Sequence, residues 1–357
     1  MTSRKIPESA VENLVSDLAS KQDKSNLSTT LLESIGYTMG GATPRNFVYE
    51  SATSIRVKSP WYCKLDGFGW FSLLQDVVIP MSDLAANTEY YIYLCNKNGV
   101  WSFETSSNST IPDGFTASSS RKVAWFHTIG ADIETGLTYD WGGATGLAHP
   151  YSGRTAGSID PNSVWCRSFR PKTNLPFFNY VEPIDLAVSV FLQSGTGTST
   201  QFVANATITD TRHYGNHLED LLSVDCRMLT EYEFAMAADG SNQKTNIAGG
   251  ADPVTTGFHK DTAGRSMISR FGLWSCCGEL WQFLQSPCAS LQTRWMGIDD
   301  GKGDTFGALA VLLGGGFWPD SSHCGSRALS GDSSRAALNA HYSVRASSPI
   351  LRGYEWA

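Results

Sequence analysis

The residue types that catalysis and metal binding require are present, but their spacings match no catalytic motif. The seven histidines are scattered along the chain, and none forms an HExxH pair. The sequence contains no GxSxG nucleophile elbow, no GxxxxGKS/T phosphate loop and no GxGxxG dinucleotide fingerprint. Gly314-Gly315-Gly316 is interpreted as a tight turn, since no helix start with a basic partner follows it. We therefore expect no catalytic residues and no enzyme activity.

The cysteines and one acidic loop are the remaining candidates for metal binding. The eight cysteines include no CxxC pair with a matching partner, so a zinc site is not expected. The adjacent Cys276 and Cys277 are interpreted as buried free thiols, although disulfides remain open. In the loop IDDGKGD the carboxylates of Asp299, Asp300 and Asp304 could hold calcium, but their spacing is not that of an EF-hand. A solvated acidic loop is favoured, and we expect no cofactor, with calcium left open.

The segment from Gly314 to Ser348 has an unusual pattern for the end of a domain. It reads GGGFWPDSSHCGSRALSGDSSRAALNAHYSVRASS, which is small, polar and irregular, with large aromatic residues at uneven intervals. Neither a helical period nor a strand alternation continues through it for long. This pattern is typical of a segment that presents side chains to a partner rather than burying them.

The composition predicts a multidomain protein rich in short strands. The chain has 357 residues, which is enough for two or three domains. Charged residues make up 17%, below the roughly 25% of ordinary soluble proteins, and there are 34 glycines. Together with the many Ser and Thr residues, this mixture indicates short strands joined by turns.

Charge and hydropathy exclude two classes of partner. The net charge of −7 and the absence of a basic stripe argue against binding to nucleic acid. No apolar run approaches the roughly 18 residues of a membrane span, so no membrane insertion is expected. The N-terminus MTSRKIPESAVENLV lacks an apolar h-region, and we therefore expect no secretory signal.

Residues 1–45 are predicted to form a short helical segment. Ser9 and Glu12 have the spacing of a capping box, and the apolar residues that follow share one helix face: Val11, Leu14, Val15 and Leu18. Such a short helix is marginal alone. Its apolar stripe is expected to pack either on the adjacent β domain or on sister chains, and the sequence leaves both open.

Residues 46–150 are predicted to form an all-β, sandwich-like domain. Residues 54–58 alternate between polar and apolar, and two β-rich runs flank Asn98-Gly99, which is a strong hairpin signal. Residues 122–126 indicate a further strand. The glycine-rich stretch over residues 141–158 is interpreted as a linker or an irregular loop.

Residues 151–357 are predicted to form an α+β domain. The runs VWCRSFRPKT and IDLAVSVFLQSG indicate strands, and HLEDLLSVDCRMLTEYEFAMAADGSNQ indicates two helices. The residues that define the apolar faces of the two helices are Leu218, Leu221 and Leu222, then Tyr232, Phe234, Met236 and Ala237. Helices embedded among short strands with long loops favour an α+β class over a sandwich.

Several blocks, taken in order, resemble a known family. LTEYEFAMAA, SRFGLWSCCGELWQFL and LLGGGFW…GSRA follow the order seen in the C-type-lectin-like fold of formylglycine-generating enzymes. With NTEYYIYLC, PDGFTASSSRKVAWFH and SVWCRSFRP they are more similar to the major tropism determinants of phages, which are variable proteins of diversity-generating retroelements. The first forty residues match least, and the tail SPILRGYEWA departs from the family pattern.

The resemblance implies that residues 314–348 form a diversified ligand-binding surface. Its framework would be Trp318, Gly325-Ser326-Arg327-Ala328 and Arg345. Its variable positions would be Phe317, Pro319, Asp320, Ser321, His323, Ser330, Asp332, Ser333, Ala337, Asn339, His341 and Tyr342. All twelve are residue types that an AAC codon can reach by changes of its adenines. Core packing is the alternative interpretation for Phe317 and Tyr342, and Trp318 is expected to lie in the core.

The implied function is receptor binding at the tip of a phage tail fibre. The resemblance implies a homotrimer that is made in the host cytoplasm, joins tail-fibre proteins in the virion, and adsorbs to a protein or glycan receptor on a bacterial surface. Two alternatives are weighed. An oxidase of the formylglycine-generating type would need a cysteine pair, but Cys324 stands alone with Leu329 at its partner's position. A variable adhesin displayed on a bacterial surface would need an anchor.

Overall fold

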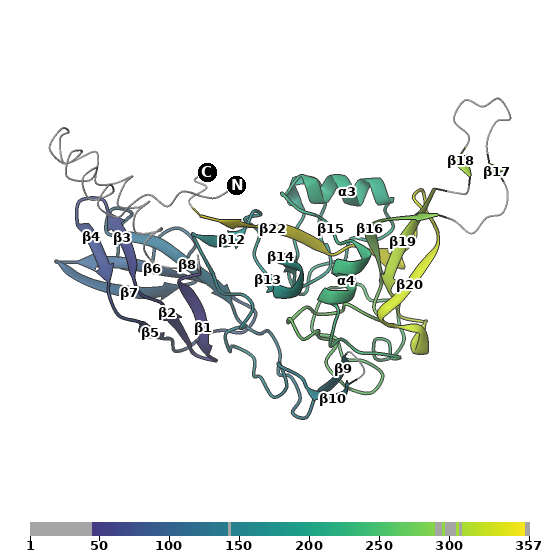
Figure 1. Cartoon of the computed structure of the whole chain (residues 1–357), viewed down its shortest axis with the longest axis horizontal. Coiled ribbons are helices and arrows are strands. Elements are labelled where there is room, and N and C mark those ends of the chain that lie inside the picture. The colour runs from purple at the N-terminus through teal and green to yellow at the C-terminus, as the bar shows by residue number, and fades with distance from the viewer. Residues whose placement is uncertain (1–44, 142–143, 290–294, 297–304, 307–308, 354–357) are drawn as a thin grey trace, which may run out of the picture.

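A computed structural model describes residues 45–141, 144–289, 295–296, 305–306 and 309–353 (Figure 1). The predicted helical segment over residues 1–45 lies outside the described residues, except for Arg45. The acidic loop with Asp299, Asp300 and Asp304 also lies outside them. The described chain is mostly β with few helices, which confirms the coarse α+β assignment.

The first described region is built from short antiparallel strands. One sheet has the order β1-β2-β5, and a separate hairpin pairs β3 with β4. These strands are β1 Phe47–Ser51, β2 Ser54–Val57, β3 Trp61–Leu65, β4 Gly69–Leu73 and β5 Val77–Pro80. The predicted alternation in β2 is confirmed, because Ile55 and Val57 are fully buried while their neighbours are partly exposed.

The Asn98-Gly99 hairpin is also confirmed. β6 Glu89–Lys97 and β7 Val100–Ser106 are antiparallel and are joined by these two residues. Asn98 has φ 55° and Gly99 has φ 83°, which is the left-handed geometry that a two-residue turn of this twist requires. β8 Ser120–His127, which includes the predicted strand over residues 122–126, pairs with the other side of β6.

One nine-stranded sheet continues through the predicted boundary at residue 150. Its order is β13-β14-β22-β12-β11-β8-β6-β7, and β15 also pairs with β22. The added strands are β11 Trp165–Cys166, β12 Phe169–Pro171, β13 Phe178–Val181, β14 Leu186–Ser189, β15 Arg227–Met228 and β22 Ala346–Arg352. β22, which follows the last of the candidate variable positions, thus joins β12 to β14 in the middle of this sheet.

The two predicted helices are present as α3 Tyr214–Leu222 and α4 Glu231–Ala237. Thr230 caps α4 in a capping box with Glu233, so two backbone N–H groups of its first turn are paired. Leu221, Phe234 and Ala237 are buried as expected. Leu222 and Tyr232 are 61% and 64% exposed, so their assignment to buried faces is wrong. The cause in α3 is that His217 and Asp220 are buried in its inward face.

The glycine-rich stretch is partly ordered as strands. β9 Thr138–Trp141 and β10 Ala144–Ala148 form a two-stranded ribbon, after which the chain runs without regular structure to β11. The remaining short elements are η1 Glu182–Ile184, η2 Gly197–Ser199, β17 Trp295–Met296 and β18 Thr305–Phe306.

A second sheet carries the irregular C-terminal segment. Its order is β20-β19-β16-β21, and it lies at the end of the molecule away from β6 and β7 (Figure 1). The elements are β16 Trp281–Ala289, β19 Leu309–Gly315, η3 Ser321–His323, β20 Gly325–Ser334 and β21 Tyr342–Ser343. α4 packs against β16, β19 and β20.

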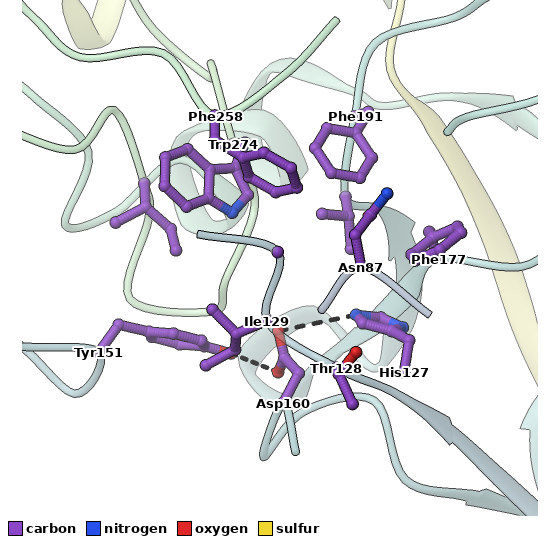
Figure 2. A pocket seen from close by; sticks show the side chains of 13 residues that line it. Asn87, His127, Thr128, Ile129, Tyr151, Asp160, Phe177, Phe191, Phe258 and Trp274 are labelled. Atoms are coloured by element: carbon purple, nitrogen blue, oxygen red, sulfur yellow. Dashed lines mark hydrogen bonds and ion pairs between the residues drawn. The ribbon is translucent and has the colours of Figure 1, made fainter. Parts of the chain in front are cut away.

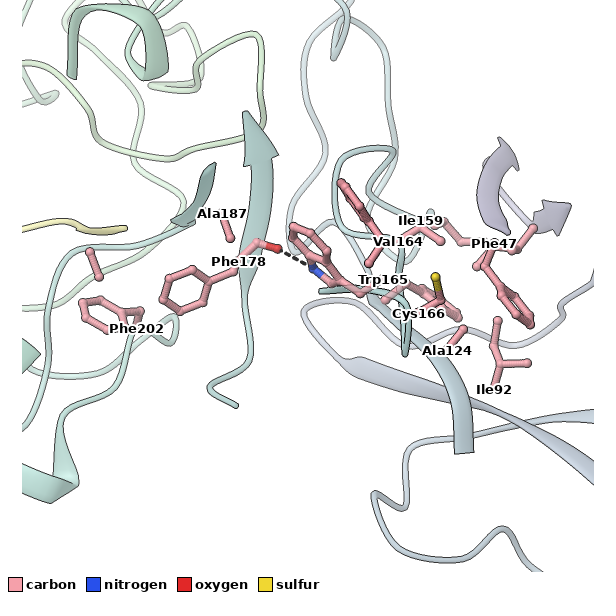
Figure 3. Close-up of a cluster of buried hydrophobic side chains, with 14 of the residues drawn as sticks. Phe47, Ile92, Ala124, Ile159, Val164, Trp165, Cys166, Phe178, Ala187 and Phe202 are labelled. Atoms are coloured by element: carbon pink, nitrogen blue, oxygen red, sulfur yellow. Dashed lines mark hydrogen bonds between the residues drawn. The ribbon is translucent and has the colours of Figure 1, made fainter. Parts of the chain in front are cut away.

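A continuous apolar core joins the two halves of the chain. Trp165 stacks on Phe169 with ring centroids 5.8 Å apart, and its indole N–H donates to the carbonyl of Phe178 at 3.0 Å (Figure 3). Phe47 and Ile92 belong to the same buried cluster. Seven of the cysteines are buried free thiols, as expected: Cys63, Cys95, Cys166, Cys226, Cys276, Cys277 and Cys324.

Candidate functional site

The candidate segment begins where β19 ends in two glycines. Gly315 has φ 100° and Gly316 has φ 82°, which only glycine adopts without strain. A Cβ atom at Gly315 would lie 2.5 Å from the carbonyl oxygen of Cys276, and one at Gly316 would lie 2.9 Å from Sγ of Cys324. The backbone therefore adopts a conformation here that no side chain could share. Gly314 and Gly315 nevertheless belong to β19 and the turn follows at Trp318-Pro319, so the predicted tight turn at the three glycines is wrong.

Arg345 fixes the other end of the segment inside the core. Its side chain is 1% exposed, and its guanidinium donates to the carbonyl oxygens of Ser189, Val190 and Trp274 and to Oε1 of Gln282. Five donors in a planar fork suit such a set of acceptors. The position predicted as framework is thus buried and fully engaged.

The middle of the framework is held by Cys324 and the residues after it. Cys324 is buried, its thiol lies 3.5 Å from the carbonyl of Phe317, and its own carbonyl accepts from Lys244 N–H at 2.8 Å. Gly325 is buried, with a hypothetical Cβ 2.3 Å from Oε1 of Gln243. Ser326 accepts from Nε2 of Gln243 at 3.0 Å. Arg327 and Ala328 follow, exposed and half-buried respectively.

The first five candidate variable positions form a compact turn. Pro319, Ser321 and His323 are exposed, whereas Phe317 and Asp320 are half-buried. Asp320 accepts from Phe317 N–H through Oδ2 at 3.1 Å, and its carbonyl accepts from His323 N–H at 3.0 Å. The carboxylate of Asp320 therefore closes the turn, and the side chains of Pro319, Ser321 and His323 are exposed on it.

An aromatic cluster brings the two ends of the segment together. The rings of Phe317 and His341 have centroids 4.4 Å apart, and Trp318 lies 5.9 Å from Phe317 and 5.8 Å from His341. On its inner side Trp318 packs against a buried apolar cluster that includes Leu192 and Leu280, which supports its expected place at the core. Phe317 and His341 cover its outer side and are half-buried themselves.

The candidate positions after Cys324 differ more widely in how far their side chains are buried. Ser330, Ala337 and Asn339 are half-buried, and the side chain of Asp332 lies outside the described set. Ser333 is 8% exposed and shares a hydrogen bond of 2.7 Å with the hydroxyl of Tyr342. The Tyr342 ring lies 5.4 Å from that of buried Phe283. Ser333 and Tyr342 therefore contact each other and the core, which is the alternative interpretation for Tyr342.

Asn339 and His341 shape the loop before β21. Oδ1 of Asn339 accepts from His341 N–H at 3.0 Å, and the carbonyl of His341 accepts from Trp281 N–H at 2.9 Å. The carbonyl of Asn339 also accepts from Thr211 N–H at 3.2 Å. These bonds attach the loop to β16 and to the chain before α3, and they place the His341 ring beside Phe317.

Three carboxylates near Trp318 were not found from the sequence. Glu279 is fully buried, its carbonyl accepts from Trp318 N–H at 2.9 Å, and its carboxylate lies 3.7 Å from Nε2 of His259. Burial raises the pKa of the Glu279 carboxyl. Burial and the neighbouring charge of Asp210 likewise raise the pKa of Asp252, opposed by His341 and Trp318. No local pattern in the sequence marks these residues.

A small cavity lies elsewhere, where β8 meets the second half of the chain (Figure 2). Asp160 accepts from Tyr151 hydroxyl at 2.6 Å and from Nδ2 of Asn179 at 3.0 Å, and Nε2 of His127 lies 3.7 Å from it. The cavity has a volume of about 10 Å³, which is room for one water molecule. None of the candidate variable positions lines it.

The chain is similar to proteins of known phages. Residues 45–166 match the family model of the Mtd second domain. The tail fiber receptor-binding protein of Bordetella phage BPP-1 is 26% identical over 281 residues, which cover 71% of this chain and 68% of that protein. Most of the chain is therefore similar to a phage receptor-binding protein, and its residues 45–166 match a domain of the Mtd family.

Solved major tropism determinants share its fold. The U1 variant matches with a TM-score of 0.71 at 23% identity, covering 87% of this chain and 85% of that one. The P3c variant matches with a TM-score of 0.70 at 23% identity over the same shares. No helix among the described residues is long and apolar enough to cross a membrane.

Proposed function

We propose that this chain is the receptor-binding protein at the tip of a phage tail fibre and attaches the virion to a bacterial surface receptor. The observation that carries the proposal is the relative over 71% of the chain, whose name is tail fiber receptor-binding protein. Residues 151–357 would form a C-type-lectin-like domain, and residues 314–348 would be its diversified binding surface.

The contrast between buried and exposed residues within residues 314–348 supports this role. Arg345, Gly315, Gly316 and Cys324 are buried and bear the structural constraints. Pro319, Ser321 and His323 are exposed, and they lie in a turn held by backbone bonds and by the carboxylate of Asp320. Side chains at such positions can change without altering the backbone. We propose that most of the twelve candidate positions contact the receptor. Ser333 and Tyr342, which contact each other and the core, would instead position the residues that do.

Assembly would multiply a weak contact. We propose a homotrimer, in which residues 1–45 and the β domain over residues 46–150 join sister chains and tail-fibre proteins. Linked sites commonly gain about 10²–10⁴ in avidity without new contacts. The protein would be made in the host cytoplasm and carried on the virion, so that several modest sites act on one cell surface.

The chemistry of Cys324 disfavours the oxidase alternative. Burial raises the pKa of its thiol to about 12, so the thiol remains protonated at neutral pH. A protonated thiol is neither a metal ligand nor a nucleophile, and the position of a partner cysteine holds Leu329, which is 40% exposed. A bacterial surface adhesin is distinguished by gene context, since tail genes beside a reverse transcriptase indicate a phage protein.

Competition with virions for host cells tests the proposal. The purified full chain should block adsorption, whereas the variant Phe317→Ala/His341→Ala/Tyr342→Ala should not. Because Tyr342 contacts Phe283, a second variant with Tyr342→Phe in place of Tyr342→Ala keeps that ring. Asp113→Asn, in an exposed turn between β7 and β8, is the control and should block fully. Full blocking by both aromatic variants would refute the proposed surface.

A further inference from the structure

Five residues on the candidate surface form what we call the aromatic–acidic patch: Asp210, Asp252, Phe317, Trp318 and His341. The three rings contact one another with centroids between 4.4 and 5.9 Å apart. All three are half-buried, so parts of their surfaces face solvent. Asp252 is exposed and Asp210 is half-buried.

The backbone places both carboxylates beside the rings. Thr207 pairs with Thr255 and Ile208 N–H donates to the carbonyl of Val254 at 3.0 Å, so the segments that lead to Asp210 and Asp252 run antiparallel, and Trp318 packs on Ile208. Thr211 N–H donates to the carbonyl of Asn339 at 3.2 Å, two residues before His341. The groups that act on Asp252 are Asp210, which makes its ionised form less favourable, and His341 and Trp318, which make it more favourable. Within the described part of the chain, no lysine or arginine forms an ion pair with Asp210 or Asp252. Arg212, the nearest arginine in sequence, pairs instead with Asp220 at 3.1 Å. No lysine or arginine of the described residues therefore neutralises these two carboxylates, and His341 is the basic group beside them.

We infer that the aromatic–acidic patch binds a lysine or arginine side chain of a protein receptor. This inference rests on the proposed function, because it requires that the patch faces a receptor. The faces of aromatic rings carry negative potential and attract cations. Two carboxylates beside the rings add Coulomb attraction, and a long basic side chain can lay its methylene groups on the rings while its charge reaches the carboxylates.

Charge complementarity also decides between kinds of receptor. Surface glycans and lipid headgroups that bear phosphate or carboxylate groups would be repelled by Asp210 and Asp252. A basic side chain on a folded receptor is instead attracted from a distance and then held by the rings. Because Phe317 and His341 are candidate variable positions, whereas Asp210, Asp252 and Trp318 are not, the acidic part would stay while the aromatic part is rewritten.

Saturation-transfer NMR on the full chain tests this chemistry with two small probes. Nα-acetyl-lysinamide carries the charge, and Nα-acetyl-norleucinamide has a similar apolar chain without it. We expect the lysine probe to bind about 3- to 30-fold more tightly, as one exposed cation–π contact and one or two surface ion pairs allow. Asp252→Asn and Asp210→Asn should each reduce this preference by about 2- to 5-fold. Asp113→Asn removes a remote carboxylate and should leave the preference unchanged.

Equal binding of the two probes would overturn the inference, as would a lysine preference that survives in the Asp210→Asn/Asp252→Asn double variant. Asp→Asn changes keep the side-chain shape, and the acceptor that Thr211 uses on Asp210 is retained, so loss of folding is not expected. The result of the NMR experiment can be told apart from the result of the competition assay with virions. Blocking by the native chain without a lysine preference would leave the proposed function standing and refute the inference. A lysine preference without blocking would refute the proposed function and, with it, the receptor side chain as the occupant of the patch.

Discussion

Arg345 offers the most direct test of how the candidate surface is supported. Replacement by methionine keeps the apolar length of the side chain and removes every guanidinium donor. In the described residues, the carbonyl of Trp274 and Oε1 of Gln282 have Arg345 as their hydrogen-bond donor, whereas the carbonyl of Val190 also accepts from Trp274 N–H at 2.9 Å. These two buried acceptors would thus lose their partner, and the carbonyl of Ser189 would lose its guanidinium donor as well.

The expected cost follows from these bonds. Each buried acceptor left without a donor costs about 1–3 kcal/mol, and removal of a buried charge offsets part of the sum. We expect Arg345→Met to lower the free energy of unfolding by about 3 kcal/mol. For a domain of about 200 residues this lowers the melting temperature by roughly 6–12 °C. The protein concentration must be held constant, because oligomerisation also shifts the midpoint.

The matched control is Arg335→Met in the same segment. Arg335 is exposed and lies over the ring of Tyr214 at 5.5 Å, a contact worth about 0.5 kcal/mol. Arg345→Lys should fall between the two, because ammonium keeps the charge but cannot reach all four acceptors. Differential scanning calorimetry of the three variants gives the comparison. If Arg345→Met melts within about 2 °C of the native protein, the framework role assigned to Arg345 is wrong.

Three further predictions follow from single positions. Gly99→Ala should lower the free energy of unfolding, measured by urea titration, by about 1 kcal/mol through backbone strain alone, because no atom lies within 4 Å of the added Cβ. Gly215→Ala within α3 is the control and should raise the free energy of unfolding slightly. Cys324 is buried and its pKa is raised to about 12, so it should resist N-ethylmaleimide in the native protein at neutral pH and react after unfolding. Peptide mass mapping measures this labelling, and rapid labelling of the native protein would contradict the buried placement. Burial raises the pKa of Glu279, so the free energy of unfolding falls as the pH rises through that pKa. Glu279→Gln should therefore be more stable than the native protein at neutral pH, and the difference should vanish in acid. A Glu279→Gln protein that is less stable than the native protein at neutral pH would refute this.

Much of the fold could be predicted because local signals and tertiary structure agree. Asn98-Gly99 specifies its hairpin through backbone conformation alone, and the alternation around Ile55 specifies which face is buried. The helix at Glu231–Ala237 begins at a capping box that is visible in the sequence. Leu222 was placed wrongly because helical spacing cannot show that polar His217 and Asp220 occupy the buried face.

The candidate site was predictable only in part. Pro319 and Ser321 are exposed and Arg345 is buried, while their assignment to variable and framework positions stays a prediction. Ser333 and Tyr342 contact each other across the loop, which a pattern of variable positions does not indicate. Asp210 and Asp252 lie far from the segment in sequence and carry no motif, so they could be found only from their position beside Trp318.

The sequence by itself determined the local conformations: the positive φ angles at glycines, the caps of helices and the period of buried strands. These depend on the few residues around each position, and so a reader of the chain can infer them. Only the tertiary structure decided that β22 joins the two halves in one sheet, and that Phe317 lies beside His341 with two carboxylates near them. Such contacts depend on how distant segments pack, which no local pattern encodes.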